Sequence, residues 1–78
     1  MKWADLRPGD QLIPMAMALR NDLGPCLVLE VNAVPQKPDE VEIVFLDLVH
    51  QKSFREKRYA SGTAALGFEL VRGGERVL

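Results

Sequence analysis

Apolar and polar residues alternate over residues 26–34, and this period of two predicts a β-strand. One face of that strand holds the apolar side chains of Leu27, Leu29, Val31 and Ala33. Glu30 and Asn32 make the opposite face polar toward its far end. A two-proline loop at residues 35–39 leads to a second such segment, residues 40–50, so we expect the two segments to form a hairpin.

The second segment changes its pattern partway along. One face carries Val41, Ile43 and Phe45, opposite Glu40 and Glu42. Asp47 then falls where that face would stay apolar, while Leu46 and Leu48 take the other face. This change predicts either a strand that is buried on both faces or a β-bulge near Leu46, of the kind that bends strands in small barrels.

Residues 11–19 allow two interpretations. Their odd-numbered positions, Ile13, Met15, Met17 and Leu19, form one apolar face of a strand. Residues 15–19 are also good helix formers, and Pro14 can open a helix but would break a central strand. We favour an edge strand, with Met15 and Met17 in the core.

Turn-forming residues separate these elements. Arg-Pro-Gly-Asp at residues 7–10 predicts a turn into the first strand, and residues 20–25 predict a loop after it. A connector of small residues spans residues 60–67, with one helical turn expected at residues 63–66. Two glycines at residues 73–74 open a short tail.

Two further strands complete the expected architecture. Residues 51–59 are polar and basic, which is typical of an exposed strand or hairpin arm. Residues 68–72 form a last short strand. The sequence therefore predicts one domain over residues 1–78, with its core between about residues 5 and 72.

A few short motifs follow one another in a recognisable order. Gly9-Asp10 opens the first strand, Gly24 precedes the apolar residues 25–29, Trp3 lies near the start, and residues 68–71 read Phe-Glu-Leu-Val. This order resembles that of the Src-homology-3-like (SH3-like) small β-barrels. It is similar to ribosome- and transcription-associated barrels, and to small barrel proteins of bacteriophages. The resemblance implies a mainly β, five-stranded SH3-like small barrel.

Composition agrees with a small folded domain. The 78 residues are 47% hydrophobic and 27% charged, with a net charge of −1 at pH 7. This balance is too apolar for a disordered chain. A chain of this length buries only about 60% of the surface that its unfolded form exposes, so its core is thin. Contact with a partner, including a second copy of the chain, would add to that core.

The number of cysteines and the N-terminal sequence indicate in which cellular compartment the protein is expected. The single Cys26 excludes an intramolecular disulfide and suits a reducing environment. The N-terminal residues lack the apolar stretch of a signal peptide, and apolar runs such as residues 43–46 are at most five residues long. We therefore expect a cytoplasmic protein that does not interact with membranes.

The chemistry-bearing residues do not predict an enzyme. The candidate nucleophiles Cys26, Ser53, Ser61 and Thr63 occur in no recognised catalytic motif. His50 and Asp47 are three residues apart, so on an extended strand they would point to opposite faces. Neither a catalytic residue nor a cofactor is predicted.

Metal binding is not predicted either. One histidine and one cysteine offer too few ligands for a zinc site within one chain. Asp39, Glu40 and Glu42 gather three carboxylates, but without the oxygen-rich, glycine-containing pattern of a calcium loop. We interpret them as a solvated acidic rim.

Charge is unevenly distributed along the chain. Residues 1–49 hold four Lys/Arg and eight Asp/Glu, whereas residues 50–78 hold six and three. The positive part concentrates in Lys52, Arg55, Lys57 and Arg58, among the aromatic side chains Phe54 and Tyr59. On a strand Arg55, Lys57 and Tyr59 would share one face. Such a mixture can contact phosphates and stack on bases, but charged residues also protect exposed strand edges.

Trp3 is the remaining candidate for a binding residue. Near a terminus it would cap the open end of a barrel or anchor a partner, and a thin core favours capping. The sequence thus predicts a non-catalytic protein-interaction or small structural module, with a second copy of the chain among its expected partners. The resemblance adds the expectation that the module is phage-encoded. Its candidate binding residues are Trp3, Lys52, Phe54, Arg55, Lys57, Arg58 and Tyr59. The alternative is a nucleic-acid-binding module that uses residues 52–59.

Overall fold

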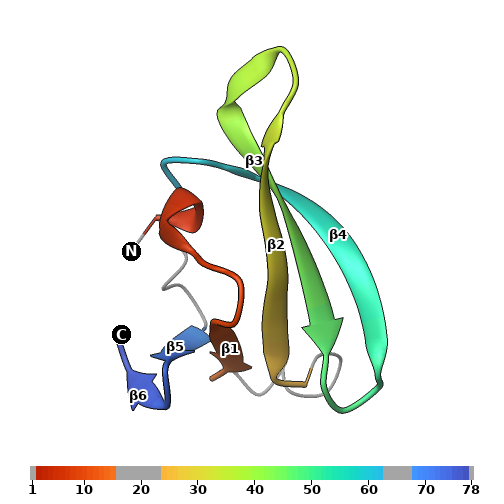
Figure 1. The fold of residues 1–78 in the computed structure, drawn as a ribbon, viewed down its shortest axis with the longest axis vertical. Coiled ribbons are helices and arrows are strands. Elements are labelled where there is room, and N and C mark those ends of the chain that lie inside the picture. Colours follow the sequence, from red (N-terminus) through yellow and green to blue (C-terminus); the bar gives the residue numbers. More distant parts are fainter. Residues whose placement is uncertain (1, 16–23, 63–67, 78) are drawn as a thin grey trace.

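The computed structural model describes residues 2–15, 24–62 and 68–77. Its strands form one antiparallel sheet in the order β4-β3-β2-β1-β5-β6 (Figure 1). The elements are η1 (a 3-10 turn, Trp3–Asp5), β1 (Gln11–Pro14), β2 (Cys26–Val34), β3 (Lys37–Asp47), β4 (Lys52–Tyr59), β5 (Phe68–Arg72) and β6 (Glu75–Arg76). The expected mainly β class is confirmed. Within the described residues the sheet is open, with β4 and β6 as its outer strands.

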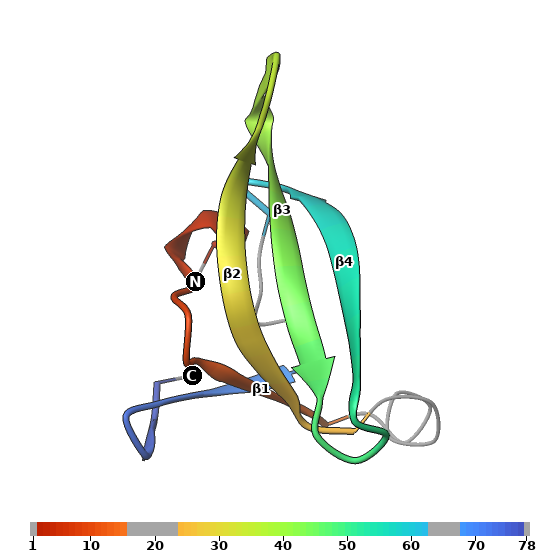
Figure 2. The ribbon, with the colours of Figure 1, turned by 45° about the vertical axis from the view of Figure 1, so that its right-hand side comes forward.

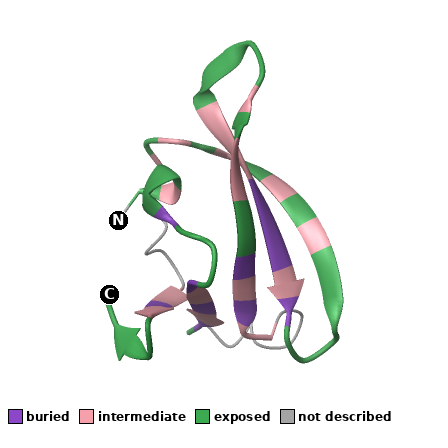
Figure 3. Ribbon diagram, in the orientation of Figure 1, coloured by how far each residue is buried: buried purple, intermediate pink, exposed green. Residues whose placement is uncertain are grey.

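The long strands β2, β3 and β4 lie side by side and bend together, and the short β1 crosses near one end of β2 (Figure 2). The core lies inside this bend. It consists of Leu6, Leu12, Cys26, Val28, Ile43, Phe45 and Leu70. The tip of the β2–β3 hairpin projects away from this core and is exposed (Figure 3). Folding therefore buries one end of the hairpin and leaves the other end in solvent.

A bulge in β2 makes the predicted inner face of that strand wrong. Cys26 and Val28 are buried, whereas Leu29 is 38% exposed. The register of β2 against β3 shifts between Val28 and Glu30, which leaves Leu29 as the extra residue. Beyond the bulge the faces exchange, so Val31 packs against the core as expected. This bulge in β2 was not predicted, and the pairing of β3 with β4 continues without a register shift through Leu46.

Strand β3 follows the other alternative that its pattern allowed. Ile43, Val44 and Phe45 are all buried, so the strand is covered on both faces at this point. Its start differs from the prediction, because the turn comprises only Pro35 and Gln36 and β3 begins at Lys37. Gln36 takes the positive φ of 66° that so tight a turn requires.

Strand β1 lies inside the sheet, between β2 and β5, so its assignment as an edge strand is wrong. Proline is tolerated because β2 pairs only with Gln11 and Leu12, whereas Pro14 pairs with Phe68 of β5. The predicted face is also wrong, since Leu12 is buried and Met15 is 46% exposed.

The remaining differences concern the ends of the predicted elements. The predicted turn before β1 is confirmed, and Gly9 adopts the positive φ of 95° there. The two glycines that were expected to open a tail instead form a turn into β6, which pairs with β5. Met17, the loop positions 20–23 and the helical turn expected at 63–66 lie outside the described residues.

Asp10, just before β1, forms an ion pair with Arg72 at the end of β5. Its carboxylate is 1% exposed and accepts two hydrogen bonds from Arg72, from Nε at 2.8 Å and from Nη2 at 2.9 Å. The backbone N–H of Arg7 donates a third at 2.8 Å. The hydrogen bond from Arg72 is the main reason why the pKa of Asp10 lies below its usual range. This ion pair was not predicted from the sequence.

Asp47 accepts hydrogen bonds from the turn between β3 and β4. The backbone N–H groups of Val49 and His50 donate to its Oδ1 at 2.9 Å and 3.0 Å. His50 Nδ1 lies 2.8 Å from its Oδ2. These bonds, first those from His50, lower the pKa of Asp47 to about 2. The expectation that His50 and Asp47 point apart is wrong, because residues 48–51 form a turn and not a strand.

Candidate functional site

Strand β4 separates the predicted binding residues into two sets. Burial alternates along the strand, so that Phe54, Glu56 and Arg58 are half-buried. The intervening residues Arg55, Lys57 and Tyr59 are exposed, which confirms that these three share one face. Lys52 is exposed at the start of the strand. The basic segment therefore has an inner and an outer face with different surroundings.

On the inner face the half-buried side chains contact other residues of the protein. The ring of Phe54 stacks on that of Phe45, with centroids 5.2 Å apart. Arg58 Nη1 lies 3.2 Å from Glu56 Oε2, and the guanidinium carbon is 5.4 Å from the centroid of Trp3. Phe54 and Arg58 thus support β4 rather than present a free surface.

Trp3 lies across the end of β4. Its backbone N–H donates to the carbonyl of Gly62 at 2.9 Å, and the N–H of Ala4 donates to Ala60 at 3.2 Å. A Cβ at Gly62 would lie 3.1 Å from Trp3 Cδ1, so a glycine permits this approach. The Trp3 side chain is partly buried and packs against the core. Its position is that of a cap, with part of the ring still accessible.

On the outer face the cations meet the carboxylates of β3. Arg55 Nη1 lies 3.0 Å from Glu42 Oε1. Lys57 is directly opposite Glu42 in the register, and Tyr59 is opposite Glu40. The acidic residues 40 and 42, which the sequence indicated to be a solvated rim, therefore offset part of the positive charge of β4. Tyr59 is 68% exposed at the end of this face.

The backbone of β4 offers hydrogen-bonding groups along one edge. The N–H of Ala60 donates to Asp39 at 2.7 Å, which makes the pair 39/60 a hydrogen-bonded one. In an antiparallel ladder such pairs alternate, so the even-numbered residues of β4 bond to β3. The N–H and C=O groups of Ser53, Arg55 and Lys57 consequently point away from β3.

Part of this edge is already satisfied. The carbonyl of Lys57 accepts a bond from Arg58 Nη1 at 2.9 Å, and that of Tyr59 accepts one from the N–H of Gly62 at 2.9 Å. No other described residue bonds to the outward N–H and C=O of Ser53 and Arg55, or to the N–H of Lys57. We call these groups the open edge of β4. The sequence could not reveal it, because it depends on the strand order.

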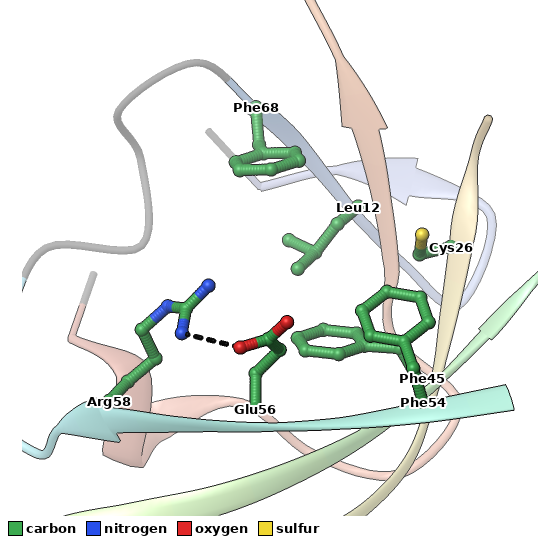
Figure 4. A pocket seen from close by; sticks show the side chains of 7 residues that line it. All are labelled: Leu12, Cys26, Phe45, Phe54, Glu56, Arg58 and Phe68. Atoms are coloured by element: carbon green, nitrogen blue, oxygen red, sulfur yellow. Dashed lines mark hydrogen bonds and ion pairs between the residues drawn. The ribbon is translucent and has the colours of Figure 1, made fainter. Parts of the chain in front are cut away.

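A small apolar pocket lies beside this edge, between the inner face of β4 and strands β1 and β5 (Figure 4). Leu12, Phe54 and Phe68 form its apolar walls, and the Glu56–Arg58 pair lies at one side. Its volume of about 40 Å³ accommodates roughly one water molecule or a methyl-sized group. Sites for small-molecule ligands usually measure about 300–1,000 Å³, so this pocket is not one of them.

Among the candidate nucleophiles, Cys26 is held in an unreactive form, and Thr63 lies outside the described residues. Cys26 is buried, and burial together with the charge of Asp47 raises the pKa of its thiol to about 11. The thiol is therefore protonated at neutral pH, and its Sγ donates to the carbonyl of Gly24 at 3.3 Å. The described part of the chain contains no group of three or more His, Cys, Asp or Glu residues that could hold a metal ion.

Comparison of the chain with protein-family models, with curated proteins and with solved structures gave no match. No helix among the described residues has the length and apolar character needed to cross a membrane. The open edge of β4 and the side chains around it are therefore the features from which a function can be argued.

Proposed function

We propose that the chain is a non-catalytic protein-binding module, and that it binds its partner through β4. The observation that carries this proposal is the open edge, where the outward N–H and C=O of Ser53 and Arg55 and the N–H of Lys57 have no partner within the described residues. Such an edge is a template for a strand of another chain. The raised pKa of Cys26 and the small volume of the pocket support a role in binding rather than in catalysis.

The finer fold assignment is part of this proposal. We propose that the bent sheet is an SH3-like small barrel that is left open between β4 and β5. The glycine turn before β1 and the succession of β1 to β5 support this assignment. The protein would then act in the cytoplasm by presenting a strand edge and loops, as small β-domains without enclosed pockets do.

A nucleic-acid-binding function is the second candidate. It is favoured by the exposed ring of Tyr59, which lies on the same face as Arg55 and Lys57. Glu42 weakens it, because this carboxylate pairs with Arg55 and lies opposite Lys57. Phosphate groups would have to compete with a carboxylate that is already in place, so we rank this function second.

Two substitutions at one position test the first proposal. Lys57→Pro removes an outward N–H without removing a bond to β3, and Lys57→Thr removes the same charge but keeps the N–H. A protein captured from lysate by the unmodified chain should be retained by Lys57→Thr and lost by Lys57→Pro. Circular dichroism should show that both variants fold. Equal retention by the two variants would overturn the proposal.

The second candidate has its own measurement. Fluorescence anisotropy with single- and double-stranded DNA and RNA, at about 50 and 200 mM salt, should show no saturable binding. Steeply salt-dependent binding that is lost in an Arg55→Glu/Lys57→Glu variant would instead make nucleic acid the partner.

A further inference from the structure

We infer that the segment bound by β4 is an extended acidic strand, which carries its acidic side chains on the outer face and a small apolar side chain over the pocket. This inference rests on the function proposed above and specifies the chemistry of its partner. It combines three observations: the open edge, the positive charge of β4, and the pocket that adjoins the inner face of the strand.

The charge of β4 favours an acidic partner. The strand carries Lys52, Arg55, Lys57 and Arg58 against the single carboxylate of Glu56, whereas the whole chain has a net charge of −1. An acidic segment is therefore attracted to β4 and repelled by the rest of the molecule. Glu42 lies on the β3 side of Arg55 and Lys57, so a strand on the opposite side approaches these two cations and not the carboxylate.

The same charges disfavour a second copy of β4 as the occupant. Antiparallel pairing of two open edges places Arg55 opposite Arg55, Lys57 opposite Lys57, or Arg55 opposite Lys57 in each register that uses both residues. Parallel in-register pairing places each cation opposite its own copy. Like charges directly opposite one another destabilise a sheet, so β4 is better suited to a different, acidic strand.

The pocket specifies the inner positions of the bound strand. Residues directly opposite one another in a sheet point to the same face. A residue that pairs beside Phe54 therefore points inward, toward the pocket between β4 and Phe68 (Figure 4). The volume of about 40 Å³ suits a methyl-sized group such as a branch of valine, and excludes a whole aromatic ring. Acidic outer positions alternating with small apolar inner positions are thus the expected pattern.

Synthetic peptides test this pattern on the unmodified protein. The probe is the fluorescein-labelled peptide EVEVEVE, and the control is EEVVVEE, which has the same composition and charge but not the alternation. We expect the alternating peptide to bind at least tenfold more tightly in an anisotropy titration. Equal affinity for the two peptides would show that only charge is recognised, and would overturn the inference.

Backbone methylation tests whether the peptide joins the sheet. In antiparallel pairing the glutamate N–H groups of EVEVEVE would bond to β4, and in parallel pairing the valine N–H groups would do so. N-methylation of one of the two sets should therefore abolish binding, while methylation of the other set leaves it within about threefold. Binding that survives both modifications would exclude strand addition.

Amide hydrogen exchange locates the bound peptide and separates failure of the inference from failure of the proposed function. Binding of EVEVEVE should slow exchange of the Arg55 and Lys57 amides at least tenfold. If the peptide fails while a captured protein still depends on the Lys57 N–H, the acidic strand is wrong and the function stands. If Lys57→Pro also has no effect on capture, both are wrong. Protection of these amides by dimerisation alone would identify a second copy as the occupant.

Discussion

The turn before β1 and the turn after β3 each contain a buried aspartate, yet the two carboxylates are satisfied in different ways. Asp10 depends on Arg72, a side chain 62 residues away at the end of β5. Asp47 depends mainly on Val49 and His50, two and three residues further along the chain, and also accepts a longer bond of 3.4 Å from the N–H of Gly24. Both carboxylates accept backbone N–H groups, but Asp10 adds a long-range ion pair with Arg72, whereas the shortest bonds to Asp47 come from its own turn.

This difference determines what each carboxylate stabilises. The contact between β1 and β5 brings together segments that are distant in sequence, so its loss separates two parts of the sheet. The Asp47 turn joins β3 to β4, which also pair along their length. Loss of Asp10 should therefore destabilise the whole fold, whereas loss of Asp47 should mainly loosen one turn.

The largest effect is expected for Asp10→Ala. Removal of this carboxylate leaves the guanidinium of Arg72 without its main partner, and we expect the free energy of unfolding to fall by about 3 kcal/mol. Urea denaturation measures this loss. Asp39→Ala is the matched control, because Asp39 is exposed and bonds to Ala60 through its backbone carbonyl, which the substitution keeps, so stability should change by less than about 0.5 kcal/mol. Equal losses in the two variants would contradict the anchoring role of Asp10.

Acidification should distinguish the two turns further. The pKa of Asp47 is lowered from 3.8 to about 2, so its stabilising contribution is present above about pH 4 and is lost as the pH falls through about 2. Asp47→Asn should be less stable than the unmodified protein at neutral pH, by less than Asp10→Ala. Its urea midpoint should also fall less between about pH 5 and about pH 2. If the urea midpoints of the two proteins changed in parallel with pH, protonation of Asp47 would not contribute to the loss of stability in acid.

A smaller effect is expected at Gly24, which lies next to the Asp47 turn. A Cβ at this position would come within 2.5 Å of Val49 Cγ2 and 3.0 Å of Asp47 Oδ1. It would also lie 2.8 Å from Val49 Cβ, which moves only with the backbone, so the exposed turn at Val49 has to shift and Gly24→Ala should cost about 1–2 kcal/mol. Thermal unfolding measures it. Gly24→Ala in the Asp47→Asn background should be less than additive if the two residues act on one turn.

The surface pair of Arg55 and Glu42 gives the smallest expected effect. Both side chains are accessible and screened by solvent, so a double-mutant cycle with Arg55→Gln and Glu42→Gln should give a coupling of about 0.5 kcal/mol or less. Salt should reduce this coupling further. A coupling above about 1 kcal/mol would mean that the outer face of β4 is more rigidly organised than its exposure indicates.

The sequence predicted the strands better than it predicted their faces. Strands β2 and β5 have the predicted bounds, because alternation and flanking turn residues are local signals. The inner face of β2 was wrong because one extra residue, Leu29, reverses the parity without leaving a compositional trace. Strand β1 was assigned to an edge because Pro14 is unfavourable in a fully paired strand, and the sequence does not show that β2 pairs with only two residues of β1.

The candidate site could be predicted only in part. Alternation correctly separated Arg55, Lys57 and Tyr59 from the inner residues of β4. Their pairing with β3, the position of Trp3 across the end of the strand and the open edge all depend on contacts between distant segments. The side chain of His50 contacts Asp47 because residues 48–51 form a turn, where a strand end was expected. Local patterns therefore identified the residues, and the topology determined their neighbours.

The buried thiol of Cys26 can be used to measure how often the sheet opens. Its thiol is 1% exposed, lies between β1 and β3, and is the only thiol in the chain. An alkylating reagent can react with it only in molecules whose sheet has separated, and unfolding restores an ordinary thiol. The rate of alkylation in native buffer therefore measures how often the sheet opens, without an engineered cysteine or a denaturant.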